Sequence, residues 1–221
     1  MSAGTVYDLA YKGDFNQVKV KLDADKALIT CPDENKRLLI HWAALGGNHN
    51  LVEYLIECGS PVDPEDDTNT TPLILAASAG RFDVVSILIG KGANVNHKTN
   101  RGQSSLQYAC SKGHFEVVKL LVQAEAYVNH IDMLGATPLH RASSQGRVNI
   151  VDFLLQCPNI QVDACDSTGS TPLHLACEED RDIVASMLVK AGASIDQQNK
   201  EKKTPLDLSS KNLQKALCDI K

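Results

Sequence analysis

The sequence predicts an all-α fold, a solenoid of seven helix-turn-helix repeats with β-turn fingers. Three observations support it: a turn motif recurs at a nearly constant interval, a Thr-Pro-Leu-His-like tetrapeptide follows each turn, and an apolar stretch with helical spacing closes each copy. The intervals are 33, 33, 33, 34 and 33 residues, between turns that open at Asp33, Asp66, Thr99, Asp132, Asp166 and Asn199. Such a period is typical of a repeat array, in which each copy packs against its neighbours.

The fifth copy shows why these residues predict two helices. Gly135 suits a tight turn, because glycine adopts positive φ without strain. Thr137 is a good helix N-cap, and Pro138 suits the first helical position, where no N–H is missed. Gly146 ends this helix, and a second helix follows with an apolar face formed by Ile150, Val151, Leu154 and Leu155.

We expect the whole chain, residues 1–221, to form a single repeat domain without a linker. Its copies run approximately over residues 1–32, 33–65, 66–98, 99–131, 132–165, 166–198 and 199–221. The first copy is degenerate, with Asp8 at the position that His41 occupies in the second. The last copy keeps Thr204-Pro205-Leu206 among polar residues. Weak patterns are expected at both ends, because an end copy faces water on one side.

The second copy contains the only tryptophan of the chain, Trp42. Tryptophan is enriched at interface hot spots, so one interpretation makes Trp42 an anchor for a partner. Packing between neighbouring copies is the favoured interpretation, because the same slot in later copies holds Leu75, Tyr108, Arg141 and Leu175.

Acidic residues gather between the second and third copies, in the segment Pro61-Val62-Asp63-Pro64-Glu65-Asp66-Asp67. A calcium site is one interpretation, but the glycine and the ligand spacing of an EF-hand loop are missing. We therefore expect a solvated acidic finger, with no metal and no cofactor.

The fourth copy departs most from the shared pattern. Ser105 replaces the proline, Gln107 replaces the histidine, and Glu125 stands where a helix-ending glycine is usual. This copy is therefore expected to be a softer part of the array. The sixth copy instead ends its first helix with an acidic cluster, Glu178-Glu179-Asp180.

No combination of residues suggests catalysis, so we expect a protein that is not an enzyme. His41, His140 and His174 occupy one slot in different copies, which indicates hydrogen bonding at helix starts rather than a metal site. The net charge of −5 and the scattered Lys and Arg residues do not support binding to nucleic acid or membrane. Without an export signal or a long apolar run, we expect a monomer of the cytoplasm and nucleus.

The seven cysteines show neither a Cys-x-x-Cys pair nor zinc-type spacing. Cys110 and Cys177 occupy the same small-residue slot and are expected to be buried. Cys157 and Cys165 flank the one-residue insertion of the fifth copy and are interpreted as ordinary loop thiols, with a disulfide as the less favoured alternative.

These motifs resemble the ankyrin repeat, and the resemblance covers essentially the whole chain. It implies a concave binding face made by finger tips and by the exposed flank of each first helix. Residues on that face vary between copies while the framework does not, as expected of a surface tailored to a partner. The candidate partner-binding residues are Arg37, Asp67, Thr70, Gln103, Lys112, Arg141, Glu178 and Glu179.

Longer stretches resemble the gankyrin family of proteasome non-ATPase regulatory subunits, namely His41-Trp42-Ala43, residues 76–81, residues 171–179 and Gly192-Ala193-Ser194-Ile195. The resemblance implies an assembly chaperone of the proteasome regulatory particle that holds the C-terminal domain of one proteasomal ATPase subunit. It implies that Arg37 and Lys112 face partner acids and that Asp67 faces partner arginines. The chain departs from the family at Thr70, in place of a tryptophan, and at Asn35, in place of an acid.

Leu175, Cys177 and Glu179 fit a Leu-x-Cys-x-Glu pattern that the same family shares and that is associated with binding to a retinoblastoma-type protein. Such a peptide binds in extended form, whereas this one is expected in a helix, so a structural role is favoured. A second hypothesis from the shared scaffold alone is an inhibitor of a cyclin-dependent kinase or a transcription factor.

Overall fold

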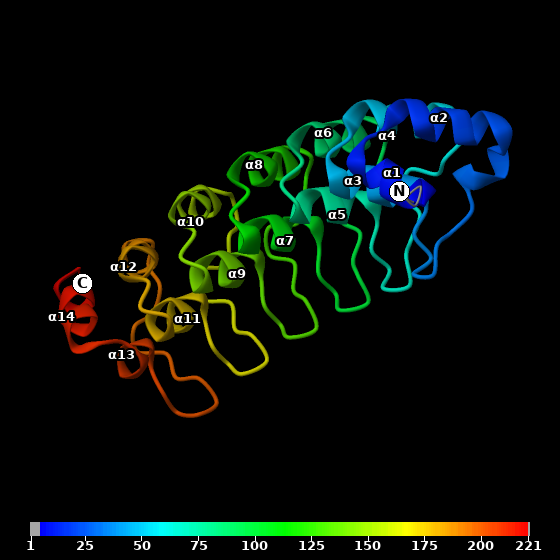
Figure 1. Ribbon diagram of the computed structural model, residues 1–221. Helices are drawn as coiled ribbons and strands as arrows, with labels where there is room; N and C mark the ends of the chain where they lie inside the picture. Colours follow the sequence, from blue (N-terminus) through cyan, green and yellow to red (C-terminus); the bar gives the residue numbers. More distant parts are fainter. Residues whose placement is uncertain (1–4, 221) are drawn as a thin grey trace. The chain divides into compact units, whose positions relative to one another are not determined.

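The computed structural model of the protein describes residues 5–220, so residues 1–4 and 221, at the ends of the first and last predicted copies, lie outside the described part. The described chain is helical, and its helices follow one another in short pairs (Figure 1). They are α1 (Val6–Lys12), α2 (Phe15–Ala24), the 3₁₀-helix η1 (Lys26–Ile29), α3 (Leu39–Gly46), α4 (His49–Glu57), α5 (Pro72–Ser78), α6 (Phe82–Gly90), α7 (Ser105–Lys112), α8 (Phe115–Gln123), α9 (Pro138–Ser144), α10 (Val148–Leu155), α11 (Pro172–Glu178), α12 (Asp182–Lys190), α13 (Pro205–Leu208) and α14 (Lys211–Ile220).

Extended pairing within residues 5–220 is limited to an isolated antiparallel bridge between Lys98 and Ser104. The prediction of an all-α fold is therefore confirmed, with long loops joining one helix pair to the next.

Threonine caps explain where the first helix of a pair begins. Thr71, Thr137, Thr171 and Thr204 each accept the backbone N–H three residues ahead, and each is followed by proline at the first helical position. Both features stabilise a helix start, because they satisfy or remove N–H groups that have no partner inside the helix. In the fourth copy Ser104 takes the capping role, accepting from the Gln107 N–H at 3.3 Å.

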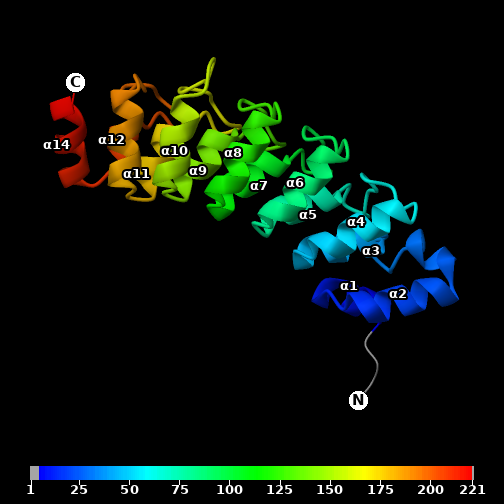
Figure 2. The ribbon, with the colours of Figure 1, turned by 90° about the horizontal axis from the view of Figure 1, so that it is seen from above.

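The described residues divide into two compact units, and each is described by itself. The first comprises residues 5–109 and 119–126 of the described chain, and the second comprises residues 110–118 and 127–220. In the first unit α1, α3 and α5 form one row and α2, α4 and α6 form another (Figures 1 and 2). In the second unit α9, α11 and α13 form one row and α10, α12 and α14 form another.

The core of each unit lies between its two rows of helices. In the first unit the fully buried side chains include Leu39, Leu55, Leu73 and Leu88, and in the second they include Leu139, Leu154, Leu173 and Leu188. Because these leucines recur at equivalent positions, successive helix pairs within a unit bury their apolar faces against one another. The loops that precede the first helices project from this packed body as fingers (Figure 1).

Within residues 5–220, none of the helices combines the length and the apolar character that crossing a bilayer requires.

Candidate partner-binding surface

Each finger is closed by the side chain of the residue that opens it. In the third copy, Asp66 Oδ1 accepts the backbone N–H groups of Thr68 at 2.9 Å and Thr70 at 2.8 Å. The same pair of bonds, to the residues two and four positions ahead, forms at Asp33, Thr99, Asp132, Asp166 and Asn199. A side chain that satisfies two turn N–H groups holds the loop in one conformation. The fingers are thus fixed supports for the residues at their tips.

Neighbouring fingers are also joined through their backbones. In the first unit the Asp67 N–H donates to the Asn35 carbonyl at 3.0 Å, and the Asn100 N–H donates to the Thr68 carbonyl at 2.9 Å. In the second unit the Ser167 N–H donates to the Leu134 carbonyl at 2.8 Å. At each of these junctions one backbone bond links the two successive fingers.

The histidines of the tetrapeptide connect each helix start to the following finger. His140 Nδ1 accepts the Thr137 N–H at 3.1 Å, and its Nε2 faces the Ser170 carbonyl at 3.0 Å. Because a carbonyl only accepts, Nε2 carries the proton and the ring is neutral. His41 and His174 make the same two kinds of contact. The predicted structural role of the three histidines is confirmed.

Burial is the main reason why these histidines stay neutral. The pKa of each lies below the usual histidine value because burial disfavours the charged ring, although the backbone hydrogen bonds and nearby aspartates oppose that effect.

A second recurring contact, which sequence reasoning missed, links the starts of α6, α10 and α12 to the first helix of the preceding pair. Arg81 donates from Nε to the Leu45 carbonyl at 3.1 Å, Arg147 to the Ser111 carbonyl at 3.2 Å, and Arg181 to the Ser144 carbonyl at 3.1 Å. A Cβ on Gly47, whose φ is +87°, would lie 2.8 Å from Arg81 Cδ, so glycine at the preceding helix end makes room for the arginine. The signal was present in the sequence as a glycine followed 34 or 35 residues later by arginine.

Among the candidate partner-binding residues of the first unit, Asp67 is exposed at a finger tip. Gln103 is half-buried, and its Oε1 accepts from the Tyr108 hydroxyl at 2.8 Å. The side chain of Thr70 is not exposed as we expected. It is buried inside its finger, with its hydroxyl 2.7 Å from that of Thr68. The expectation of an exposed side chain at position 70 is therefore corrected, since the finger curls around Asp66 and turns this side chain inward.

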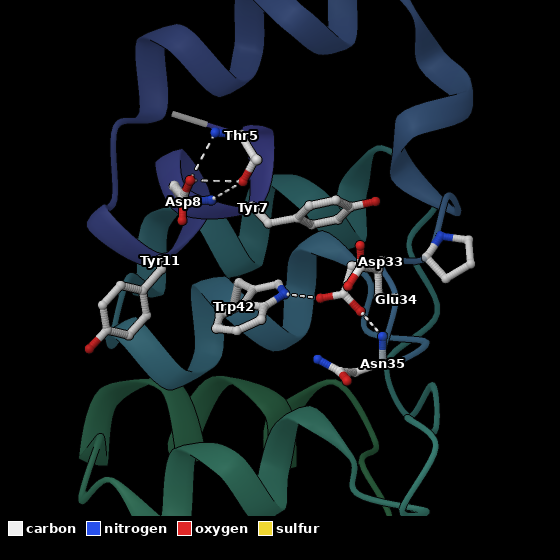
Figure 3. A pocket seen from close by; sticks show the side chains of 9 residues that line it. Thr5, Tyr7, Asp8, Tyr11, Asp33, Glu34, Asn35 and Trp42 are labelled. Atoms are coloured by element: carbon white, nitrogen blue, oxygen red, sulfur yellow. Dashed lines mark hydrogen bonds between the residues drawn. The ribbon is translucent and has the colours of Figure 1, made fainter. Parts of the chain in front are cut away.

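Arg37 is held inside the first unit. Its Nε donates to Asp66 Oδ2 at 3.0 Å, and its guanidinium carbon lies 5.3 Å from the centroid of the Trp42 ring. Trp42 is half-buried, its Nε1 donates to Asp33 Oδ2 at 2.8 Å (Figure 3), and its ring meets Tyr11 edge-on. These contacts support the packing interpretation of Trp42.

Among the candidate residues of the second unit, Lys112, Glu178 and Glu179 are exposed. Glu179 forms a 3.8 Å contact with Arg181, which is long and solvated. Arg141 is half-buried and donates from Nη2 to Asp132, the residue that closes its own finger. Arg141 thus repeats the arrangement of Trp42 and Asp33, nine residues apart in both cases.

The Leu-x-Cys-x-Glu residues lie in α11 or at its end. Cys177 is fully buried, Leu175 is half-buried and Glu179 is exposed. As expected, the pattern is helical with its cysteine packed inside.

Sequence reasoning missed an apolar finger in the second unit. Ile131, Met133 and Leu134 are exposed, Met133 by 75% and Leu134 by 59%. The corresponding tip residues of other fingers are polar, among them Glu34, Asp67, Asn100, Ser167 and Lys200. This contrast was visible in the sequence and marks Met133 and Leu134 as candidate contact residues.

None of the seven cysteines, all of which lie within residues 5–220, forms a disulfide in the structure. Cys110 and Cys177 are buried as predicted, and burial raises the pKa of both thiols. Cys165 is exposed, whereas Cys157 is half-buried. Among residues 5–220, His, Cys, Asp and Glu side chains form no group of three that would hold a metal ion.

Comparison with known proteins agrees with this geometry. Ankyrin repeat models match residues 7–99, 91–166 and 168–200. A solved structure, the human ASB11 ankyrin repeat domain, superimposes with a TM-score of 0.89 and 26% identity over 99% of this chain and 98% of that one.

The 26S proteasome non-ATPase regulatory subunit 10 is similar over a shorter stretch. The mouse protein is 41% identical and the human protein 42% identical over 67 residues. That stretch is 30% of this chain and about 30% of either relative, so the match covers less than a third of their length. The matched repeats extend over most of the sequence, so the chain belongs to the ankyrin repeat family and is a protein-interaction scaffold.

Proposed function

We propose that the protein is a non-enzymatic assembly chaperone of the proteasome regulatory particle, which binds the C-terminal domain of one proteasomal ATPase subunit through its finger tips and first-helix flanks. The observation that carries the proposal is the contrast between a constant frame and variable tips. The frame consists of three kinds of contact that recur in several copies: the side-chain bonds that close the fingers, the backbone bonds between fingers, and the histidine contacts between a helix start and the following finger. The exposed tip residues do not repeat, and partial similarity to proteasome subunit 10 suggests the partner.

The frame matters because rigid supports lower the cost of binding. A loop that is already fixed loses little conformational freedom when a partner binds. The proposal treats the seven copies as one domain, in line with the period of the sequence.

The residues that we assign to binding are the exposed ones. In the first unit this role falls to Asp67, and in the second to Lys112, Met133, Leu134, Glu178 and Glu179. Apolar side chains at the centre of a contact with charges around it are typical of protein interfaces. Charges of both signs favour a partner with a complementary pattern.

Arg37 and Arg141, both candidate partner-binding residues in the sequence analysis, receive a different role here. Both are committed to buried finger aspartates, so we assign them to the frame that presents the tips. Thr70 belongs to the frame as well, because its side chain is buried.

The test is calorimetric titration of the whole protein with the C-terminal domain of each proteasomal ATPase subunit, at two salt concentrations. The proposal expects one domain to bind, and more weakly at the higher salt, because exposed charges are screened. If none of these domains binds while a cyclin-dependent kinase, a retinoblastoma-type protein or a transcription factor does, the alternative role as an ankyrin-type regulator replaces the chaperone role.

A further inference from the structure

The first unit contains a cavity of about 450 Å³ between α1, α3 and the finger that opens at Asp33 (Figure 3). Its volume lies in the range of roughly 300–1,000 Å³ that is usual for ligand pockets. Its lining includes Tyr7, Asp8, Tyr11, Asp33, Glu34 and Trp42. The lining combines three aromatic side chains with three carboxylates and contains neither lysine nor arginine.

The aromatic walls are held in place. The Tyr7 hydroxyl donates to the Cys31 carbonyl at 3.1 Å, and burial is the main cause that raises the pKa of Tyr7 to about 12, so this ring stays neutral. The Tyr11 and Trp42 rings meet edge-on, with centroids 6.3 Å apart and an angle of 89° between their planes. Trp42 is fixed in turn by its bond to Asp33. The pocket therefore has preformed π-faces.

The three carboxylates differ in how far they are engaged. Asp8 accepts the Thr5 N–H at 2.8 Å and the Thr5 hydroxyl at 3.0 Å, and Asp33 accepts from Trp42 and from the finger backbone. Glu34 is exposed, and the described residues provide no hydrogen bond to its carboxylate. Glu34 is thus the acid best placed to bind a ligand group, and the other two add negative potential.

The Trp42 ring already attracts one guanidinium within the chain, that of Arg37 at 5.3 Å. Cation–π attraction of this kind acts within about 6 Å of a ring centroid and is strongest for tryptophan. A guanidinium also stacks on aromatic rings and forms paired hydrogen bonds with a carboxylate, which an ammonium group does not. An anion would be repelled by the lining.

We propose that this cavity, the aromatic-acidic pocket, binds an arginine side chain of a partner protein. The guanidinium stacks on these aromatic rings and donates to Glu34. The inference deepens the proposed function and rests on it, because it assumes that the ligand is part of a protein, and it names the chemistry that the partner presents to the first unit.

The sole tryptophan of the chain makes the pocket directly observable. We would titrate the whole protein with a short blocked peptide, Gly-Ser-Arg-Ser-Gly, and follow Trp42 fluorescence. A saturable change with a Kd of about 1 mM or tighter is expected. The same peptide with citrulline, which keeps the shape but lacks the charge, should bind at least tenfold more weakly. A peptide with lysine should bind severalfold more weakly.

Three results would overturn the inference. The first is equal binding of the arginine and citrulline peptides, and the second is no saturable signal from either. The third is a lysine peptide that binds as tightly as the arginine peptide, since that would remove the role of the planar group.

Variants localise the effect to the pocket. Glu34→Gln should lower the affinity for the arginine peptide about fivefold. Glu57→Gln makes the same charge change at an exposed position on α4 outside the pocket and should leave the affinity unchanged. Equal affinities of the Glu34 and Glu57 variants would contradict the assignment.

Failure of the pocket and failure of the chaperone role are distinguishable. If an ATPase domain binds but the peptide does not, only the pocket assignment falls. If the arginine peptide binds and no ATPase domain does, the pocket stands and the partner must be sought elsewhere.

Discussion

Arg37 of the second copy donates from Nε to Asp66 of the third at 3.0 Å, and the side chain of Asp66 is fully buried whereas that of Arg37 is 23% exposed. The same carboxylate closes the finger through its other oxygen. One side chain therefore holds its own finger and contacts an arginine of the preceding copy.

Replacing Arg37 should consequently reduce stability. Arg37→Ala leaves the buried Asp66 carboxylate without its charged partner, and we expect a loss of about 1–3 kcal/mol in the free energy of unfolding. Lys112→Ala removes an exposed cation and should change stability by less than about 0.5 kcal/mol. Urea unfolding of both variants measures the difference. Equal stability of the two variants would return Arg37 to the set of free contact residues.

Stability should fall as the pH drops from about 7 to 5. His41, His140 and His174 have lowered pKa values in the folded state, so below about pH 6.5 the unfolded chain binds protons that the folded chain does not. Each histidine then contributes a slope of at most about 1.4 kcal/mol per pH unit, with stability rising as pH rises.

His140→Gln isolates one of these contributions. Glutamine is a matched replacement, because Gln107 occupies the same slot in the fourth copy and accepts the Ser104 N–H at 3.0 Å. Urea unfolding between pH 5 and 7.5 should show a shallower dependence for the variant. Identical slopes would mean that His140 does not lose its charge on folding.

The fourth copy offers a stabilising substitution. Glu125 has φ +64°, whereas Gly92 and Gly192, at the equivalent helix ends, have φ +86° and +93°. Glu125→Gly removes the strain of a left-handed non-glycine residue and should raise stability by about 0.5–1 kcal/mol. Glu125→Gln removes only the charge and should not. Thermal unfolding compares them, and a gain for the glutamine variant alone would point to charge instead of backbone strain.

The Leu-x-Cys-x-Glu segment should be inaccessible in the folded protein. Cys177 is fully buried, and burial, assisted by Asp180 and Asp182, raises the pKa of its thiol to about 12. Alkylation followed by mass spectrometry should show fast reaction at the exposed Cys165 and reaction at Cys177 only on unfolding. Comparable rates at the two thiols would show that α11 opens readily and would favour binding to a retinoblastoma-type protein.

Much of the fold was predictable from the sequence because its determinants are local. A threonine, a proline and a turn residue act on their own neighbours, so the 33-residue period predicts the helix pairs directly. Whether a tip side chain is exposed depends on how the whole finger closes and on partners in other copies. Thr70 is buried by the closure of its own finger, and Arg37 is held by an aspartate that lies 29 residues ahead. Met133 and Leu134 stand out only when the finger tips of all copies are compared, because the tips of the other fingers are polar.

The central claim is that the finger tips bind the partner, and the apolar finger tests it most directly. Titration of the ATPase domain should show that the Met133→Ser/Leu134→Ser variant binds at least tenfold more weakly than the unaltered protein, with unchanged stability. Ile183→Ser, on α12, removes an apolar side chain that is 63% exposed but lies outside the fingers, and should bind within twofold of the unaltered protein. Equal affinities of both variants, or a larger loss for Ile183→Ser, would contradict the claim.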